Sequence, residues 1–145
     1  IVEEQTIVYT ETVKSGAMPP PRAAPKNPAW QRTLMPDPVL LFRYSALTFN
    51  PHRIHYDQPY VTQEEGYPGL VVHGPLIATL MVDLCRRNRP EARIIGFSFR
   101  AMAPLFCGNE MVLGAAPSED GLSASVWAVN HEGGLASQGE VTFAD

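Results

Sequence analysis

The chain has 145 residues and a formal net charge of −4, and its 45% share of hydrophobic residues excludes a chain that is disordered throughout. This length fits one domain with a core large enough to be stable without disulfides. The acidic balance argues against nucleic acid as the main partner, because phosphate binding needs clustered Lys and Arg. No apolar run approaches the roughly 20 residues of a membrane helix, and no signal sequence opens the chain. We therefore expect a cytoplasmic protein with no nucleic-acid and no membrane partner.

The first part of the chain divides into a strand and a proline-rich stretch. Residues 1–13 alternate β-branched and aromatic side chains with polar ones, which predicts a strand. Seven of the 14 prolines fall within 19–38. Because each proline fixes φ and removes a donor, we predict a linker over 14–38. The remaining residues, 39–145, are expected to form the main domain, which opens on an apolar run that suits a strand or a buried helical turn.

One long helix is expected in the middle of the chain. The segment TFNPHRIHYD, at 48–57, is polar and aromatic with a central proline, which predicts a structured loop. After it, the sequence predicts a helix over 75–87, because Pro75 suits a first helical turn and Pro90 stops the helix. Nearly all its residues are apolar, so this helix must be wrapped by other structure.

The chain changes to a period of two residues from position 91 onward. Four apolar alternating segments are separated by CGN, EDG and HEGG, which are hairpin signals. Four successive strands after one buried helix predict an antiparallel sheet that curls around that helix. The predicted fold class is therefore α+β.

Three histidines form the best candidate site. His52, His55 and His73 flank the start of the predicted helix, and neutral histidine suits proton transfer near pH 7. Capping of backbone groups by the loop histidines is the alternative. No carboxylate or cysteine completes a metal-binding set, and Cys85 and Cys107 are expected to be buried and reduced. We therefore predict no metal.

The tripeptide His73-Gly74-Pro75 marks the predicted helix start. Gly74 has no side chain to obstruct a ligand, and its backbone N–H lies at the positive end of the helix dipole. Such a donor can stabilise an oxyanion that develops on a thioester or amide carbonyl. The alternative for His73 is a structural residue that holds the loop at the helix start.

Two stretches together resemble a known family. YSALTFNPHRIHYD followed by YPGLVVHGPLIATLMVDL is similar to the MaoC-like, R-specific enoyl-thioester hydratases and dehydratases, nearest to the 3-hydroxyacyl-thioester dehydratases and the mesaconyl-CoA or itaconyl-CoA hydratases. The resemblance covers about 39–145. It implies a hot-dog fold, in which a curved antiparallel sheet wraps a long apolar central helix. It also implies a CoA or acyl-carrier-protein thioester as substrate, no further cofactor, and a homodimer or a paired double hot-dog.

The resemblance also implies roles for single residues. It places His55 on the family's catalytic histidine and Asn50 on the position of the family's aspartate. Because Asn50 cannot take a proton, His55 must be the principal acid and base in the reversible hydration of an α,β-unsaturated acyl thioester. Asn50 is expected to orient the water, and the Gly74 N–H to face the thioester carbonyl.

Arginines are the remaining informative charges. Arg43, Arg53 and Arg100 lie beside or inside apolar segments, where each guanidinium needs an anionic partner. That partner is either a nearby acidic residue or a substrate carboxylate or CoA phosphate. We predict that Arg53 and Arg100, together with Tyr56 and His73, bind the substrate.

Two alternative hypotheses about the function stay open. A hot-dog thioesterase commonly needs a carboxylate on the central helix, but Asp83 lies roughly two turns beyond Gly74. A non-catalytic hot-dog half would only shape a partner's pocket, whereas Asn50 and His55 favour the catalytic unit. The first residue is Ile and a strand is predicted early, so we expect the C-terminal half of a two-module chain. Residues 14–38 would then be the connector.

Overall fold

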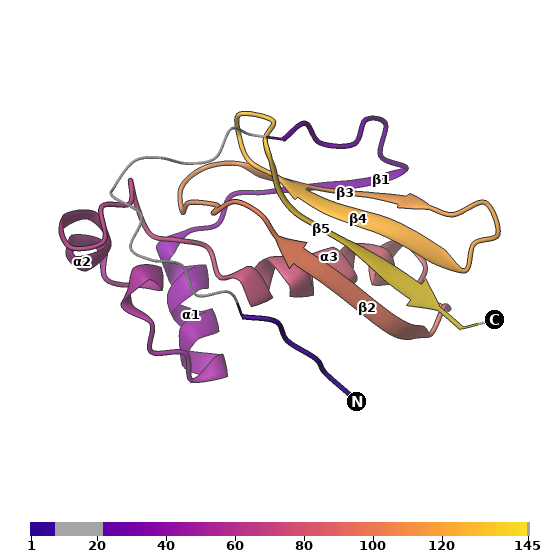
Figure 1. Ribbon diagram of the computed structural model, residues 1–145, viewed down its shortest axis with the longest axis horizontal. Helices are drawn as coiled ribbons and strands as arrows, with labels where there is room; N and C mark the ends of the chain where they lie inside the picture. Colours follow the sequence, from indigo (N-terminus) through magenta and orange to yellow (C-terminus); the bar gives the residue numbers. More distant parts are fainter. Residues whose placement is uncertain (8–21, 145) are drawn as a thin grey trace.

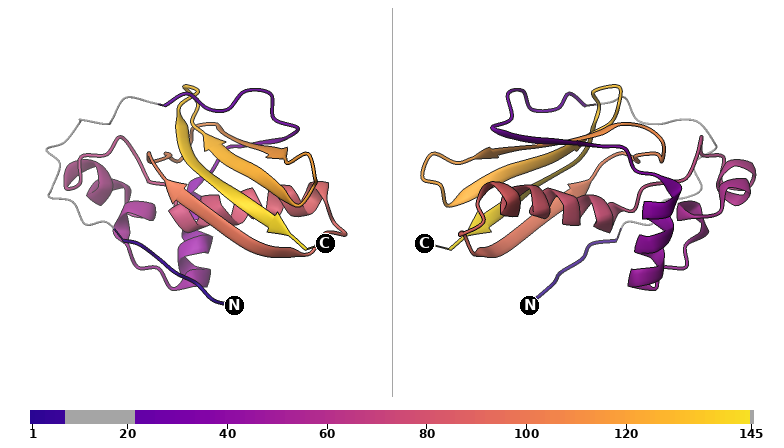
Figure 2. Two further views of the ribbon diagram at one scale, coloured as in Figure 1. Left: turned by 45° about the vertical axis from the view of Figure 1, so that its right-hand side comes forward. Right: turned by 180° about the vertical axis from the view of Figure 1, so that it is seen from behind.

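The computed structural model describes residues 1–7 and 22–144 (Figure 1). A five-stranded antiparallel sheet has the order β1-β3-β4-β5-β2, and α3 lies along one of its faces (Figures 1 and 2). The elements in chain order are β1 (Trp30–Leu34), α1 (Pro38–Thr48), the 3-10 helix η1 (Arg53–His55), α2 (Gln58–Gln63), α3 (Gly74–Asn88), β2 (Ile94–Ala101), β3 (Met111–Pro117), β4 (Ser123–Val129) and β5 (Leu135–Phe143).

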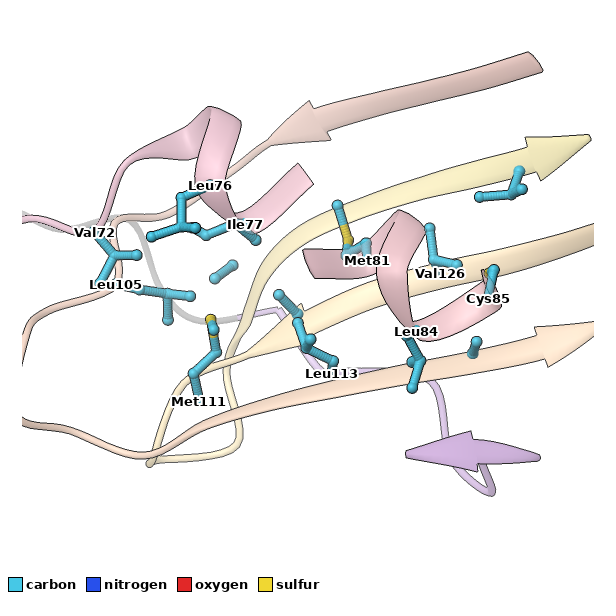
Figure 3. Close-up of a cluster of buried hydrophobic side chains, with 14 of the residues drawn as sticks. Val72, Leu76, Ile77, Met81, Leu84, Cys85, Leu105, Met111, Leu113 and Val126 are labelled. Carbon is cyan, nitrogen blue, oxygen red and sulfur yellow. The ribbon is translucent and has the colours of Figure 1, made fainter. Parts of the chain in front are cut away.

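Helix α3 supplies the centre of the core. Its Met81, Leu84 and Cys85 are buried against inward-facing strand residues such as Leu113 and Val126 (Figure 3). Burial of a side chain of this size contributes about 1.5–3 kcal/mol, so this packing holds the helix in place against the sheet. The predicted α+β arrangement, with a curved sheet around an apolar helix, is confirmed.

The apolar composition of α3 predicted a helix enclosed on every side, but the structure leaves one side open. Thr79 and Arg86 are exposed, and Leu80 and Val82 are only half-buried. One face of α3 therefore meets solvent in this chain, while the opposite face is packed on the sheet.

The face of the sheet that points away from α3 carries a second, smaller apolar cluster. Trp127, Val129 and Leu135 are buried there. The N-terminal segment 22–25 runs over this face, where the Leu135 N–H donates to the carbonyl of Arg22 (2.8 Å) (Figure 1). The helix thus covers one face of the sheet, whereas on the other face Ala24 of this segment packs only against the Trp127 cluster.

The predicted strand and linker at the start of the chain need correction. Residues 1–7 form no strand, and residues 8–21, which hold the rest of the predicted strand and the start of the predicted linker, lie outside the described residues. Within the predicted linker over 14–38, the chain forms β1, which pairs antiparallel with β3 from Trp30 to Leu34. No proline occurs between these two residues, so their N–H groups are available to the ladder. The sheet therefore recruits residues that precede position 39.

Helix α1 resolves the ambiguity of the apolar run that opens the main domain. Asp37 caps it, with Oδ1 accepting the Leu40 N–H at 2.7 Å, and Pro38 stands in its first turn. Leu41 and Ser45, one helical turn apart, are its buried residues. The four predicted strands after position 91 are confirmed as β2 to β5. Among the described residues, no helix is long and apolar enough to cross a membrane.

Candidate active site

The loop between α1 and α2 is held in shape by its own side chains. Asn50 Oδ1 accepts the N–H of His52 at 3.0 Å, and the Tyr56 hydroxyl donates to the carbonyl of Pro51 at 2.8 Å. Asp57 then caps α2 by accepting the Tyr60 N–H at 3.0 Å. These bonds fix η1, and with it the position of its last residue, His55.

His55 is buried, with 7% of its surface exposed. Its Nδ1 lies 2.7 Å from the carbonyl oxygen of Val71. Because a carbonyl can only accept, Nδ1 must carry the proton, which leaves Nε2 of the neutral ring with a free lone pair. Burial lowers the pKa of His55, and the charge of His52 lowers it further, against the opposing effect of the Val71 hydrogen bond. The site thus holds a neutral imidazole that can accept a proton.

His73 lies directly against His55. The two rings stack with centroids 3.7 Å apart and planes inclined by 17°. His73 Nε2 lies 2.8 Å from the hydroxyl of Ser45, and Tyr44 meets the His73 ring edge-on at 4.8 Å. Burial, and then the charges of His55 and His52, lower the pKa of His73 to about 4. His73 is therefore neutral at physiological pH.

Gly74 is the first residue of α3 and is half-buried. A Cβ added there would meet no atom within 4 Å, and the backbone does not take the left-handed conformation that requires glycine. Its N–H has no acceptor among the described residues, and it lies at the positive end of the helix dipole. Nothing in the local fold demands glycine here, so the open space beside Gly74 is available to a ligand.

Two predicted substrate-binding residues have structural partners. Arg53 forms an ion pair with Asp57 (2.8 Å), and its guanidinium lies 4.0 Å from the centroid of the Tyr60 ring. The expectation that an acidic neighbour pairs with this arginine is thus met. The ring of Tyr56 is partly exposed while its hydroxyl closes the loop. A role in substrate binding remains a prediction for both residues.

The other two predicted substrate-binding residues differ in position and exposure. Arg100 is exposed on β2 and lines a separate cavity of about 460 Å³ together with Trp127, Gln138 and Glu140. His73 has none of its surface exposed. Tyr44 and the neighbouring His55 lie against the ring, so it presents no surface to a ligand in this structure, and its contact with a substrate stays a prediction.

The sequence-based reasoning missed Ser45 and the carbonyl of Val71. Ser45 is the polar member of the two buried residues of α1 and lies one turn after Leu41. The position of Ser45 on the buried side can be recognised only once the segment is known to be a helix. No sequence signal could have identified a backbone carbonyl as the partner of His55.

No group of three His, Cys, Asp or Glu residues within 1–7 and 22–144 is placed to hold a metal ion. Cys85 is buried, and burial raises the pKa of its thiol to about 11. Cys107, expected to be buried, is half-buried, and both cysteines are free.

A helix wrapped by a curved sheet, with a loop histidine beside the start of that helix, defines a hot-dog protein. Residues 1–107 match the family described as hydroxyacyl-thioester dehydratase type 2, and the chain belongs to this family. It is 54% identical over 121 residues to the mesaconyl-C(4)-CoA hydratase of Chloroflexus aurantiacus, a match that covers 83% of this chain and 43% of the relative. The chain spans less than half the length of the curated relatives it matches.

Solved structures agree on the fold. The (R)-hydratase of A. caviae superposes with a TM-score of 0.68 at 22% identity, covering 78% of this chain and 90% of that one. A MaoC-like dehydratase from Phytophthora capsici has a TM-score of 0.70 at 18% identity, covering 91% of this chain but 48% of that one. The same fold thus occurs in chains of about this length and in chains of twice this length.

The buried histidines predict a loss of stability in mild acid. In the unfolded chain His73 titrates near the ordinary value of about 6.5, whereas its folded pKa is about 4. At a pH between these two pKa values, His73 is protonated in the unfolded state and neutral in the folded state. The free energy of unfolding therefore falls as the pH falls. Urea unfolding at pH 7 and pH 4.5 measures this loss. His73→Gln should reduce it, and His131→Gln, at an exposed turn, should not. Titration of His73 near 6.5 in the folded protein would contradict the expectation.

Proposed function

We propose that this chain is the catalytic unit of a hydratase or dehydratase that acts reversibly on an α,β-unsaturated acyl thioester. The observation that carries the proposal is the lone pair of His55 Nε2, left free by the Nδ1–Val71 bond in the loop that leads to α3. The 54% identity to a mesaconyl-C(4)-CoA hydratase supports it. Enoyl-CoA, 3-hydroxyacyl-CoA and mesaconyl- or itaconyl-type thioesters all fit this chemistry.

Hydration needs a base for the water, a proton for the α-carbon and a donor for the enolate oxygen. His55 Nε2 takes a proton from the water as the water oxygen bonds to the β-carbon. The π electrons of the double bond move toward the thioester carbonyl, and the His55 imidazolium then returns the proton to the α-carbon. Water is added across the double bond, and the enzyme ends unchanged.

The Gly74 N–H is the proposed donor for the enolate oxygen. It is the first N–H of a 15-residue helix, and the space beside it is open. Pro75 follows and has no N–H, so Gly74 presents the leading donor of the first turn. A thioester carbonyl placed there would gain charge in the transition state next to a fixed dipole.

Asn50 keeps groups that can contact a water. Its Oδ1 accepts the His52 N–H, which leaves one lone pair of that oxygen and the Nδ2 group for other partners. An amide N–H donates to the water oxygen, which leaves the water's own hydrogens for His55.

The thioesterase alternative is not supported by the central helix. Asp83 is in ion pairs with Arg32 (2.8 Å) and Arg87 (2.6 Å), which tie α3 to β1 and to its own next turn. These partners hold the pKa of the Asp83 carboxyl below its usual value. A carboxylate so engaged serves the fold, and the proposed chemistry does not use it.

We also propose that a second hot-dog module covers the free edge of β2. This strand ends the sheet, and its Ile95 and Phe99 are exposed. Phe42, Leu47 and Phe49 at α1 and its C-terminal end are exposed as well. The length of the relatives favours a module on the same polypeptide, and a second copy of this chain is the alternative.

Replacing His55 by Ala should lower kcat for the hydration of mesaconyl-CoA or crotonyl-CoA by about 10²- to 10⁴-fold, because the proton-transfer group is removed. The assay follows loss of the enoyl-thioester absorbance with the full-length protein. His131→Ala, at an exposed turn between β4 and β5, is the matched control and should retain activity. Near-normal turnover by His55→Ala would refute the assignment.

Gly74→Ala should lower activity without lowering the stability of the fold. The added methyl group enters open space, so the free energy of unfolding should stay the same or rise by up to about 1 kcal/mol. Activity should fall about 10- to 100-fold, because the methyl obstructs the carbonyl beside the donor. Gly69→Ala, which also meets open space, is the control. Equal kcat/KM for Gly74→Ala and the wild-type protein would exclude the donor role.

Pairing of β2 can be tested by hydrogen exchange in the full-length protein. The alternate amides of β2 that do not bond to β5 should exchange slowly if another strand covers them. Ile95→Lys should accelerate their exchange, and Leu122→Lys, at an exposed hairpin turn, should not. Fast exchange of these amides in the wild-type protein would show that the edge is free.

A further inference from the structure

We propose that Ser45 and His73 form a positioning pair that holds the ring of His55 in its reactive orientation. This inference rests on the proposed function, because it assigns a task to two residues that do not themselves contact the substrate. Neither the helix cap at His73 nor the packing of α1 accounts for the arrangement.

Four aromatic rings lie in a row across three elements. Tyr44 of α1 meets His73 edge-on, His73 stacks on His55, and His52 meets His55 edge-on with centroids 5.5 Å apart. The two central rings are nearly parallel, so rotation of His55 about its own bonds would break the stack. The plane of His55 is therefore set by the plane of His73.

The plane of His73 is in turn set by Ser45. The 2.8 Å contact from Ser45 Oγ to His73 Nε2 is the one hydrogen bond of this ring among the described residues, and Nδ1 has no partner there. Burying such a polar ring costs free energy that an apolar ring would not. A phenylalanine could fill the space and stack, but it could not be anchored by a hydroxyl.

A capping role does not explain His73. It stands at the N-cap of α3, but its side chain makes no capping hydrogen bond to the helix. The ring points instead to Ser45 and His55. The side chain thus serves the neighbouring loop rather than the helix that it precedes.

The pair also has to be uncharged for His55 to work. The groups that face the two rings are Tyr44 and Ser45 from α1, His52 from the loop, and the Val71 carbonyl. None of these is a carboxylate that would favour a charged His73. Because His73 stays neutral, His55 can become an imidazolium during the reaction without a second positive charge in contact with it.

A double-mutant cycle on Ser45→Ala and His73→Phe tests the proposal in the full-length protein. If Ser45 acts through His73, Ser45→Ala should lower kcat about 5- to 20-fold with KM within about twofold, because a misplaced base slows the chemical step alone. His73→Phe should lower kcat at least as much. The double variant should be no slower than His73→Phe, because coupled residues are not additive.

Ser137→Ala is the matched control, since it removes another buried hydroxyl, on β5, from outside the ring row. Its kcat should equal that of the wild-type protein. Ser45→Cys, which keeps the size with a weaker hydrogen bond, should give an intermediate kcat and serves if Ser45→Ala does not fold. Additive losses, or a change in KM alone, would overturn the positioning role.

A readout without substrate separates this inference from the proposed function. The chain has four histidines, so their ring nitrogens can be assigned by NMR after ¹⁵N-histidine labelling. His55 should show one tautomer with the proton on Nδ1 in the wild-type protein, and a tautomer mixture in Ser45→Ala. An unchanged His55 signal in Ser45→Ala would refute the positioning pair. Absence of hydration by the wild-type protein, with the NMR change present, would refute only the proposed function.

Discussion

The burial of two stacked histidines at the start of α3 is the constraint on which the site depends. Each ring is hydrogen-bonded at one nitrogen, to Val71 for His55 and to Ser45 for His73. Burial favours the neutral form of both rings. A neutral imidazole with a fixed tautomer is what a base requires, and the core provides it by excluding water rather than by adding a charged partner.

The hydrophobic core determines where this pair lies. Leu76 and Ile77, directly after the start of α3, are buried with Val72 and Leu105 (Figure 3). The Val72 N–H donates to the carbonyl of Leu105 at 2.8 Å, which holds the segment before the helix against the loop before β3. The start of α3 is therefore a rigid part of the structure, and a donor or a ring placed there does not need to be ordered when substrate binds.

The sequence predicted those elements whose evidence is local. Strands β2 to β5 and helix α3 could be predicted because each hydrophobic pattern is contained in one stretch of chain. Strand β1 could not be predicted, because it forms by pairing with β3, about 80 positions further on. The flanking prolines suggested a linker instead. The bond between Ser45 and His73 joins positions 28 apart, so His55 could be identified from its motif while the residues behind it could not.

Asparagine at position 50 is consistent with this electrostatic design. A carboxylate beside His55 at position 50 would favour the imidazolium form of His55 and raise its pKa, which would oppose the effect of burial. The neutral amide of Asn50 leaves burial as the leading influence on His55, and its Oδ1 meanwhile fixes the loop through His52. One uncharged side chain thus holds the loop in shape and adds no negative charge beside His55, so asparagine at this position is compatible with the proposed mechanism, in which histidine alone moves the proton.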